Sequence, residues 1–129
     1  MIPATHLAID ATLCGRPRRL SEGRAEVVLD TLPSMVADDA GLVHGGFVFG
    51  CVDYAAMLAV NHPNVVLGAA DCRFLAPVRL ADRLVAEAQV EEAAGRKRRV
   101  RVTARVGERE VLTGVLTCFV LQDHVLAGC

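Results

Sequence analysis

Hydrophobic and polar residues alternate along much of this chain, and this period of two predicts β-strands. The predicted strands cover residues 7–13, 24–32, 65–75, 83–91, 99–106 and 111–121. The run at 111–121 is apolar on both faces, which is typical of a strand in the interior of a sheet. Residues 15–23 and 33–41 have the composition of turns and connectors.

One stretch departs from this alternation. Residues 47–60 read FVFGCVDYAAMLAV, which is too long and too uniformly apolar for a half-buried strand, so it predicts a buried helix. Pro63 follows closely and should end that helix. Strands on both sides of a single buried helix predict an α+β fold, in which an antiparallel sheet wraps around the helix. The length suits one domain over residues 1–129.

The composition of the chain excludes several classes of protein. Basic and acidic residues number 14 and 15, so bulk charge does not favour a nucleic-acid or membrane-surface protein. Five cysteines, without metal-ligand spacing, favour unpaired thiols in a reducing compartment over disulfides or zinc. The first residues lack a basic and apolar leader, and residues 47–60 are too short to span a bilayer. We therefore expect a cytoplasmic protein.

Two features at the predicted helix carry candidate chemistry. His44-Gly45-Gly46 directly precedes it, and the free N–H groups of a helix start can stabilise an oxyanion, although the same residues also suit an ordinary helix entry. Asp53 is the only charged side chain in the apolar run. A carboxylate in such surroundings is a candidate general base or nucleophile, or else a structural residue satisfied by backbone amides or by an arginine across an interface.

The spacing of these features bears on assembly. Gly46 and Asp53 are seven residues apart, so they share a helix face but lie about 10 Å apart along the axis. A reacting carbonyl needs both groups within about 3 Å. If the two act together, Asp53 must come from a second copy, which predicts a homo-oligomer with sites at the interface.

The sequence at these positions resembles a known family. HGGFVFGCVDYAAM at 44–57 and RFLAPVRLADRLVAEAQV at 73–90 are similar to the hot dog fold acyl-CoA thioesterases, in particular the PaaI-like (phenylacetic acid degradation) branch. The chain departs from that pattern at Ala76, often basic in the family, and at Ala81, usually glycine. Met57 stands where some members hold the water with Thr or Ser.

The resemblance implies a fold, an activity and roles for particular residues. Hot dog domains form dimers with a continuous sheet and often dimers of dimers. Gly46 N–H would polarise the thioester carbonyl, Asp53 of the facing subunit would activate water or attack directly, and His44 and Gly45 would shape the loop. Residues 67–69, which are Leu67, Gly68 and Ala69, would line the pantetheine channel. No metal or cofactor is implied beyond the CoA of the substrate.

Alternatives stay open at this point. A non-catalytic acyl-CoA binding or sensing module could use the same fold, and a hot dog dehydratase is a third reading, suggested only by Asn61-His62-Pro63. The acyl group, and CoA as against acyl carrier protein, are not set by the sequence. The basic run that includes Arg96, Lys97 and Arg98 fits a polar strand face better than nucleic acid, with CoA phosphate as a second interpretation.

The remaining reactive side chains are assigned to the surface or the core. His6, His62 and His124 have no partners at metal spacing and are interpreted as surface or loop residues. Cys51 lacks a histidine placed to activate it and is interpreted as core packing.

Overall fold

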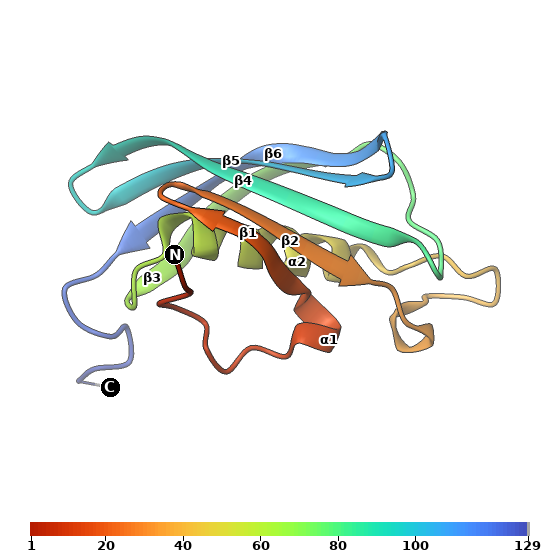
Figure 1. Cartoon of the computed structure of the whole chain (residues 1–129), viewed down its shortest axis with the longest axis horizontal. Helices are drawn as coiled ribbons and strands as arrows, with labels where there is room; N and C mark the ends of the chain where they lie inside the picture. Colours follow the sequence, from red (N-terminus) through yellow and green to blue (C-terminus); the bar gives the residue numbers. More distant parts are fainter. Residues whose placement is uncertain (129) are drawn as a thin grey trace.

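The computed structural model describes residues 1–128 and consists of one antiparallel sheet with a long helix packed on it (Figure 1). In chain order the elements are α1 (Ala11–Cys14), β1 (Arg16–Ser21), β2 (Arg24–Asp30), η1 (Pro33–Met35), α2 (Gly45–Val60), β3 (Val65–Phe74), β4 (Arg83–Ala94), β5 (Lys97–Val106) and β6 (Arg109–Val120). The strand order is β1-β2-β4-β5-β6-β3, and all neighbouring strands are antiparallel. This confirms the predicted α+β hot dog architecture.

Helix α2 is the centre of the hydrophobic core, as predicted. Its buried residues are Val48, Cys51, Val52, Tyr54, Ala55, Ala56, Met57, Leu58 and Ala59. Asn61 ends the helix in the left-handed conformation, with φ of 52°. The helix begins at Gly45 rather than at residue 47, so His44 is its N-cap and the two glycines form part of its first turn. The prediction that both glycines precede the helix was therefore wrong, because the helix begins two residues earlier than expected.

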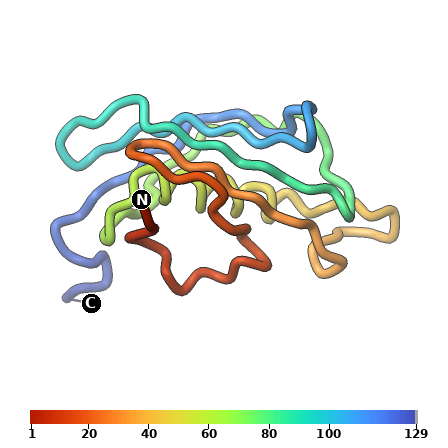
Figure 2. The backbone as a smooth tube through the Cα atoms, viewed as in Figure 1, coloured from red at the N-terminus to blue at the C-terminus, as the bar shows by residue number. Residues whose placement is uncertain are grey.

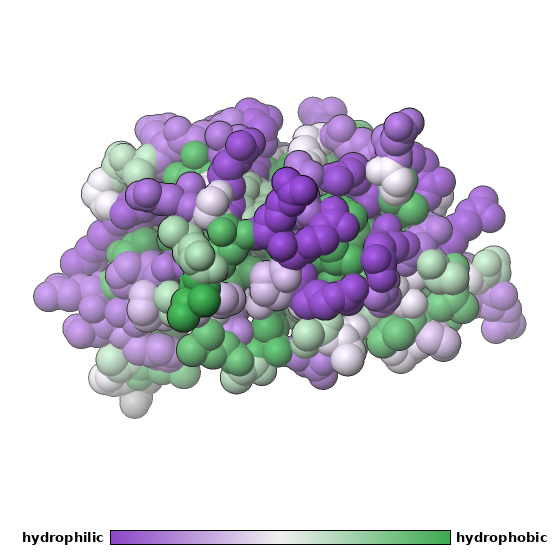
Figure 3. All heavy atoms as spheres, in the orientation of Figure 1, coloured by the Kyte–Doolittle hydropathy of each residue, from purple (hydrophilic) through white to green (hydrophobic). Residues whose placement is uncertain are grey.

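Alternation along the strands determines which side chains face α2. Ala86 and Ala88 on β4 pair with Ala104 and Val102 on β5, and all four are buried. Small side chains at these positions let the helix pack close to the sheet, which fits a core with few aromatic residues. The opposite face carries charged residues and ion pairs such as Arg105–Glu87. Hydrophilic side chains accordingly cover the upper, sheet side of the molecule (Figure 3).

The N-terminal region differs from its prediction. Residues 7–13 do not form a strand: Asp10 accepts a hydrogen bond from the Thr12 N–H and caps the short helix α1. The predicted turn at 15–23 is largely strand β1, paired with β2. β1 tolerates Pro17 because it is an edge strand, with an irregularity in pairing between Pro17 and Arg19. Local composition was overridden here by pairing with β2.

Strand β3 forms the other edge of the sheet. It pairs with β6 along one side, and most of its residues beyond Leu67 are exposed. The exposed residues Phe74 and Leu75 continue this edge toward the start of α2. The run predicted at 111–121 corresponds to β6, which lies between β5 and β3 as an interior strand. No helix in residues 1–128 is both long enough and apolar enough to cross a membrane.

Candidate functional site

Asp53 lies on the side of α2 that the sheet does not cover. Gly46, Phe49, Gly50 and Asp53 recur at helical spacing, and none of the four is fully buried, whereas most of the helix is. Within the described residues, the Asp53 Oδ1 atom is buried and has no hydrogen-bond partner. A buried carboxylate oxygen without a donor is costly in a purely structural role.

Asp53 lines a pocket of about 450 Å³. The residues that line this pocket come from the N-terminal segment, α2, the start of β3 and the C-terminal segment: Thr5, His6, Asp53, Met57, Pro63, Val65, Val66, Leu67 and His124. Apolar side chains dominate the part contributed by β3 and the end of α2. The rest of the lining is polar, so the pocket offers both an apolar wall and polar groups that converge on it, as small-molecule sites do.

The electrostatic environment of Asp53 favours a proton-accepting role. Burial raises the pKa of the Asp53 carboxyl, and the charge of His6 partly opposes this. Burial, followed by the nearby Asp53 charge, raises the pKa of the Cys118 thiol to about 12. A carboxyl whose pKa is raised above its ordinary value is a stronger base than an ordinary aspartate, which suits general-base chemistry.

The glycine pair lies at the other end of the same helix. The His44 N–H donates to Met35 O at 2.9 Å, which fixes the chain where the helix begins. Gly45 and Gly46 follow, and their N–H groups have no acceptor within the helix. Gly46 is exposed, and a Cβ atom added to it would lie 3.2 Å from the His44 ring. The Gly46 N–H therefore belongs to a helix start that a ligand can approach closely.

The structure brings only some of the predicted site residues together. Asp53 and Leu67 line the same pocket, whereas Gly68 and Ala69 are exposed on β3 and are not among its lining residues. His44, Gly45 and Gly46 also lie outside that pocket, about two helical turns from Asp53. Within one chain, the glycines and the carboxylate are separate.

Two histidines in the Asp53 pocket were missed by the sequence analysis. His6 and His124 are exposed overall, as expected for surface residues, but both line the pocket. They are far from Asp53 in sequence, so no local spacing links them to it. Only the path of the two terminal segments places them there (Figure 2).

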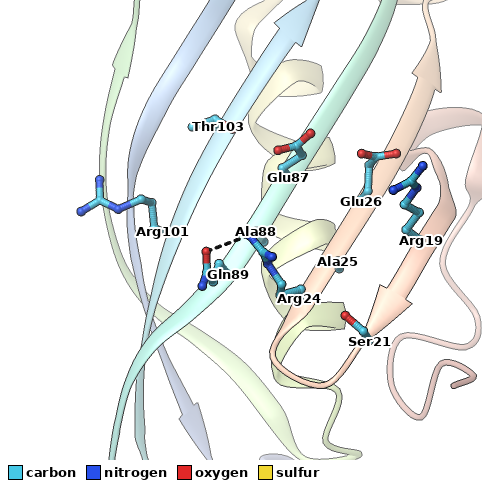
Figure 4. Close-up of a pocket in the computed structure, with 10 residues that line it drawn as sticks. All are labelled: Arg19, Ser21, Arg24, Ala25, Glu26, Glu87, Ala88, Gln89, Arg101 and Thr103. Atoms are coloured by element: carbon cyan, nitrogen blue, oxygen red, sulfur yellow. Dashed lines mark hydrogen bonds between the residues drawn. The ribbon is translucent and has the colours of Figure 1, made fainter.

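Two further hollows lie elsewhere. One of about 440 Å³ lies on the face of the sheet opposite α2, where Arg19, Arg24 and Arg101 surround acidic and amide side chains (Figure 4). The other, of about 360 Å³, is lined partly by Arg96 and Arg98 near the β4–β5 turn. Across residues 1–128, no three His, Cys, Asp or Glu side chains are grouped so as to hold a metal ion.

Comparison with known proteins identifies the family of the chain. The thioesterase superfamily profile matches residues 40–113. A protein of Aquifex aeolicus named methylthioribose-1-phosphate isomerase is 53% identical over 124 residues, which are 96% of this chain and 27% of that protein. The transcription factor FapR of Shouchella clausii is 31% identical over 93 residues, 72% of this chain and 49% of FapR. This chain thus spans about a quarter and about half of these two relatives.

Solved structures agree with this placement. The uncharacterized protein PH1136 of Pyrococcus horikoshii is 50% identical with a TM-score of 0.95, covering 98% of this chain and 99% of that one. A mutant of the phenylacetic acid degradation protein PaaI of Thermus thermophilus is 25% identical with a TM-score of 0.77, covering 84% of this chain and 95% of that one. From its profile match and its hot dog fold, the chain belongs to the thioesterase superfamily.

Proposed function

We propose that this protein hydrolyses an acyl-CoA, or a related acyl thioester, to a free acid and a thiol. The observation that carries the proposal is Asp53, which lines a pocket with an apolar wall and whose Oδ1 atom is buried without a hydrogen-bond partner within residues 1–128. The exposed N–H of Gly46, on the same side of the same helix, supplies the second group that thioester hydrolysis needs. Membership in the thioesterase superfamily supports the same reaction class.

The active unit in this proposal is a dimer. Gly46 and Asp53 of one chain lie about 10 Å apart along α2, too far to act on one carbonyl. A second α2 running antiparallel beside the first would bring its Asp53 to Gly46. Gly50 lies between them on this side, and a Cβ atom there would meet no described atom within 4 Å, which leaves room for close approach. The open edge of β3 would continue the sheet into the partner, and such dimers could pair again into a tetramer.

The residues then have distinct tasks. Gly46 N–H stabilises the negative charge that develops on the carbonyl oxygen, while His44 and Gly45 hold the loop in shape. Asp53 of the partner takes a proton from water as the water oxygen attacks the carbonyl carbon, and it returns that proton to the thiolate as the C–S bond breaks. Direct attack by the carboxylate, followed by hydrolysis of the anhydride, is the alternative route. Leu67, with Gly68 and Ala69 beyond it, would border the pantetheine channel.

Water and carboxylate suffice for this reaction, so we expect no metal or cofactor besides the CoA of the substrate. The isomerase name belongs to a protein of which this chain covers only 27%. The relatives named as the transcription factor FapR carry a regulatory and not an enzymatic name. They favour a second candidate function for this chain, a domain that binds an acyl thioester without hydrolysing it. We expect the protein to be cytoplasmic, where acyl-CoA is available.

A thiol-release assay with a panel of acyl-CoAs separates these functions. Wild type should release thiol, and Asp53→Asn should lose at least about a hundredfold in kcat, the range for removing a general base. Asp39→Asn, in an exposed loop, is the matched control and should retain activity. Tight binding of acyl-CoA by wild type without thiol release would instead establish the binding domain.

Mixed dimers test whether the site is shared between chains. Gly46→Pro removes the N–H at a first-turn position that tolerates proline, and Asp53→Asn removes the base. Each variant alone should be inactive. Co-refolding the two should restore up to about a quarter of wild-type activity, because each mixed dimer has one intact pair. No recovery, with mixed dimers verified by mass spectrometry, would show that the two groups do not act across the interface.

A further inference from the structure

We propose that His6 is a positioning residue for Asp53 of the same chain, and that the two form a histidine–aspartate pair across the pocket. This inference rests on the proposed function, in which Asp53 acts as the base. It adds a residue from the N-terminal segment to a site otherwise built from α2 and β3.

The N-terminal segment is hydrogen-bonded to the end of α2. The Ala4 N–H donates to Asn61 Oδ1 at 2.7 Å, and Asn61 Nδ2 donates to Ile2 O at 3.1 Å. Asn61 is also the residue that ends α2. Figure 2 shows the first residues, in red, passing beside the end of the helix. The position of His6 relative to Asp53 is therefore set by the same residue that terminates the helix.

The ring of His6 is held on two sides. Its Nδ1 lies 2.8 Å from Oγ1 of Thr5, which is itself only 4% exposed. Its ring centroid lies 6.3 Å from that of Tyr54, at an interplanar angle of 39°. With Nδ1 engaged by the Thr5 hydroxyl, Nε2 is the ring nitrogen left for the pocket, which Asp53 also lines.

The backbone at His6 supports a specific placement. His6 adopts φ of 55°, in the left-handed region that non-glycine residues seldom occupy, and its carbonyl accepts from the Ile9 N–H at 3.2 Å. Such a conformation costs free energy and persists only where surrounding contacts impose it. Here it turns the chain at the point where the ring joins the pocket.

His6 is also the cationic group that acts on Asp53. The titratable groups around Asp53 are the thiols of Cys14 on α1 and Cys118 on β6, and the imidazoles of His6 and His124. Burial raises the pKa of both thiols, so they stay neutral. The charge of His6 lowers the pKa of Asp53 against the effect of burial. A positively charged imidazole at this position favours the ionised form of the carboxylate.

The test compares His6→Asn with His124→Asn. Asparagine tolerates the left-handed backbone of His6. His124 lines the same pocket, but the charge that acts on the Asp53 carboxyl is that of His6, so His124→Asn is the matched control for the NMR titration. The readouts are the Asp53 carboxyl titration by carbon-13 NMR and the pH profile of thiol release. In His6→Asn the Asp53 pKa should rise, and the acidic limb of kcat/KM should move to higher pH. His124→Asn should leave the Asp53 titration unchanged.

The NMR readout does not depend on catalysis, so the two proposals fail separately. A higher Asp53 pKa in His6→Asn supports the pair even if no acyl-CoA is hydrolysed. An unchanged Asp53 titration in a folded His6→Asn overturns the pair, even if the protein is an active thioesterase. Should His6→Asn not fold, Thr5→Val removes the hydroxyl at Nδ1 and should shift the Asp53 titration in the same direction; an unchanged titration there also overturns the pair.

Discussion

Replacement of Asp53 by asparagine should make the fold more stable while abolishing activity. In residues 1–128 the Asp53 Oδ1 atom is buried with no donor, and burial raises the pKa of the carboxyl. The ionised group is therefore less well solvated in the folded chain than in the unfolded chain. Asparagine has nearly the same shape and carries no charge, so it removes most of this penalty.

The size of the effect follows from the exposure of the site. Leaving a buried acceptor without a partner costs about 1–3 kcal/mol. Asp53 is only partly buried and an asparagine amide regains part of the cost, so the variant should gain about 1 kcal/mol. For a domain of this size that corresponds to a rise in Tm of about 4 °C.

The pH dependence distinguishes this explanation from a packing effect. Because the folded-state pKa of Asp53 is raised, the folded chain binds this proton more tightly than the unfolded chain does. Wild type keeps its full stability below the unfolded-state pKa of about 4 and loses part of it as the pH rises through the folded-state value. The advantage of Asp53→Asn should therefore be present at pH 8 and absent near pH 4.

Thermal unfolding by circular dichroism or calorimetry, at pH values from 4 to about 8, measures this difference. Asp39→Asn, in an exposed loop, controls for the general effect of removing a charge. If Asp53→Asn were less stable than wild type throughout, the favourable interactions of the carboxylate, including that with the charge of His6, would outweigh the cost of its burial, and the argument from a net burial penalty would be refuted.

Three further predictions concern the close packing at Gly114, the buried thiols, and the hollow lined partly by Arg96 and Arg98. Gly114→Ala should lower the free energy of unfolding by about 2 kcal/mol or more, because its Cβ atom would lie 2.5 Å from the Asp71 carbonyl oxygen on β3, and denaturant titration measures this free energy. Cys51 and Cys118, whose pKa values burial raises to about 12, should resist a thiol reagent at pH 8 until the chain unfolds, as counted by mass spectrometry. Arg96→Glu should raise KM for an acyl-CoA but not for the matching acyl-pantetheine if its hollow binds CoA phosphates, and equal effects on both substrates would exclude that role.

Period-two alternation was a sound guide where a strand has one face against the core. The strands at 83–91 and 99–106 were predicted from it, and both correspond to strands whose inner residues contact α2. It was a poor guide at 7–13, because Asp10 caps a helical turn there through its side chain, a contact that hydrophobic spacing does not encode. β1 was missed because an edge strand with a proline has little pattern of its own and forms by pairing with β2.

The candidate site also has a part that the sequence predicts and a part that only the tertiary structure decides. By itself the sequence determined a buried helix with one charged residue, Asp53, and a glycine start that includes Gly46, because both are local features of a continuous run. Their separation along the helix also follows from sequence, since helical rise is fixed. Only the tertiary structure decided that Asp53 opens into a pocket beside His6 and His124. Those residues come from the two ends of the chain, and no local rule relates segments that meet only when the hydrophobic core forms.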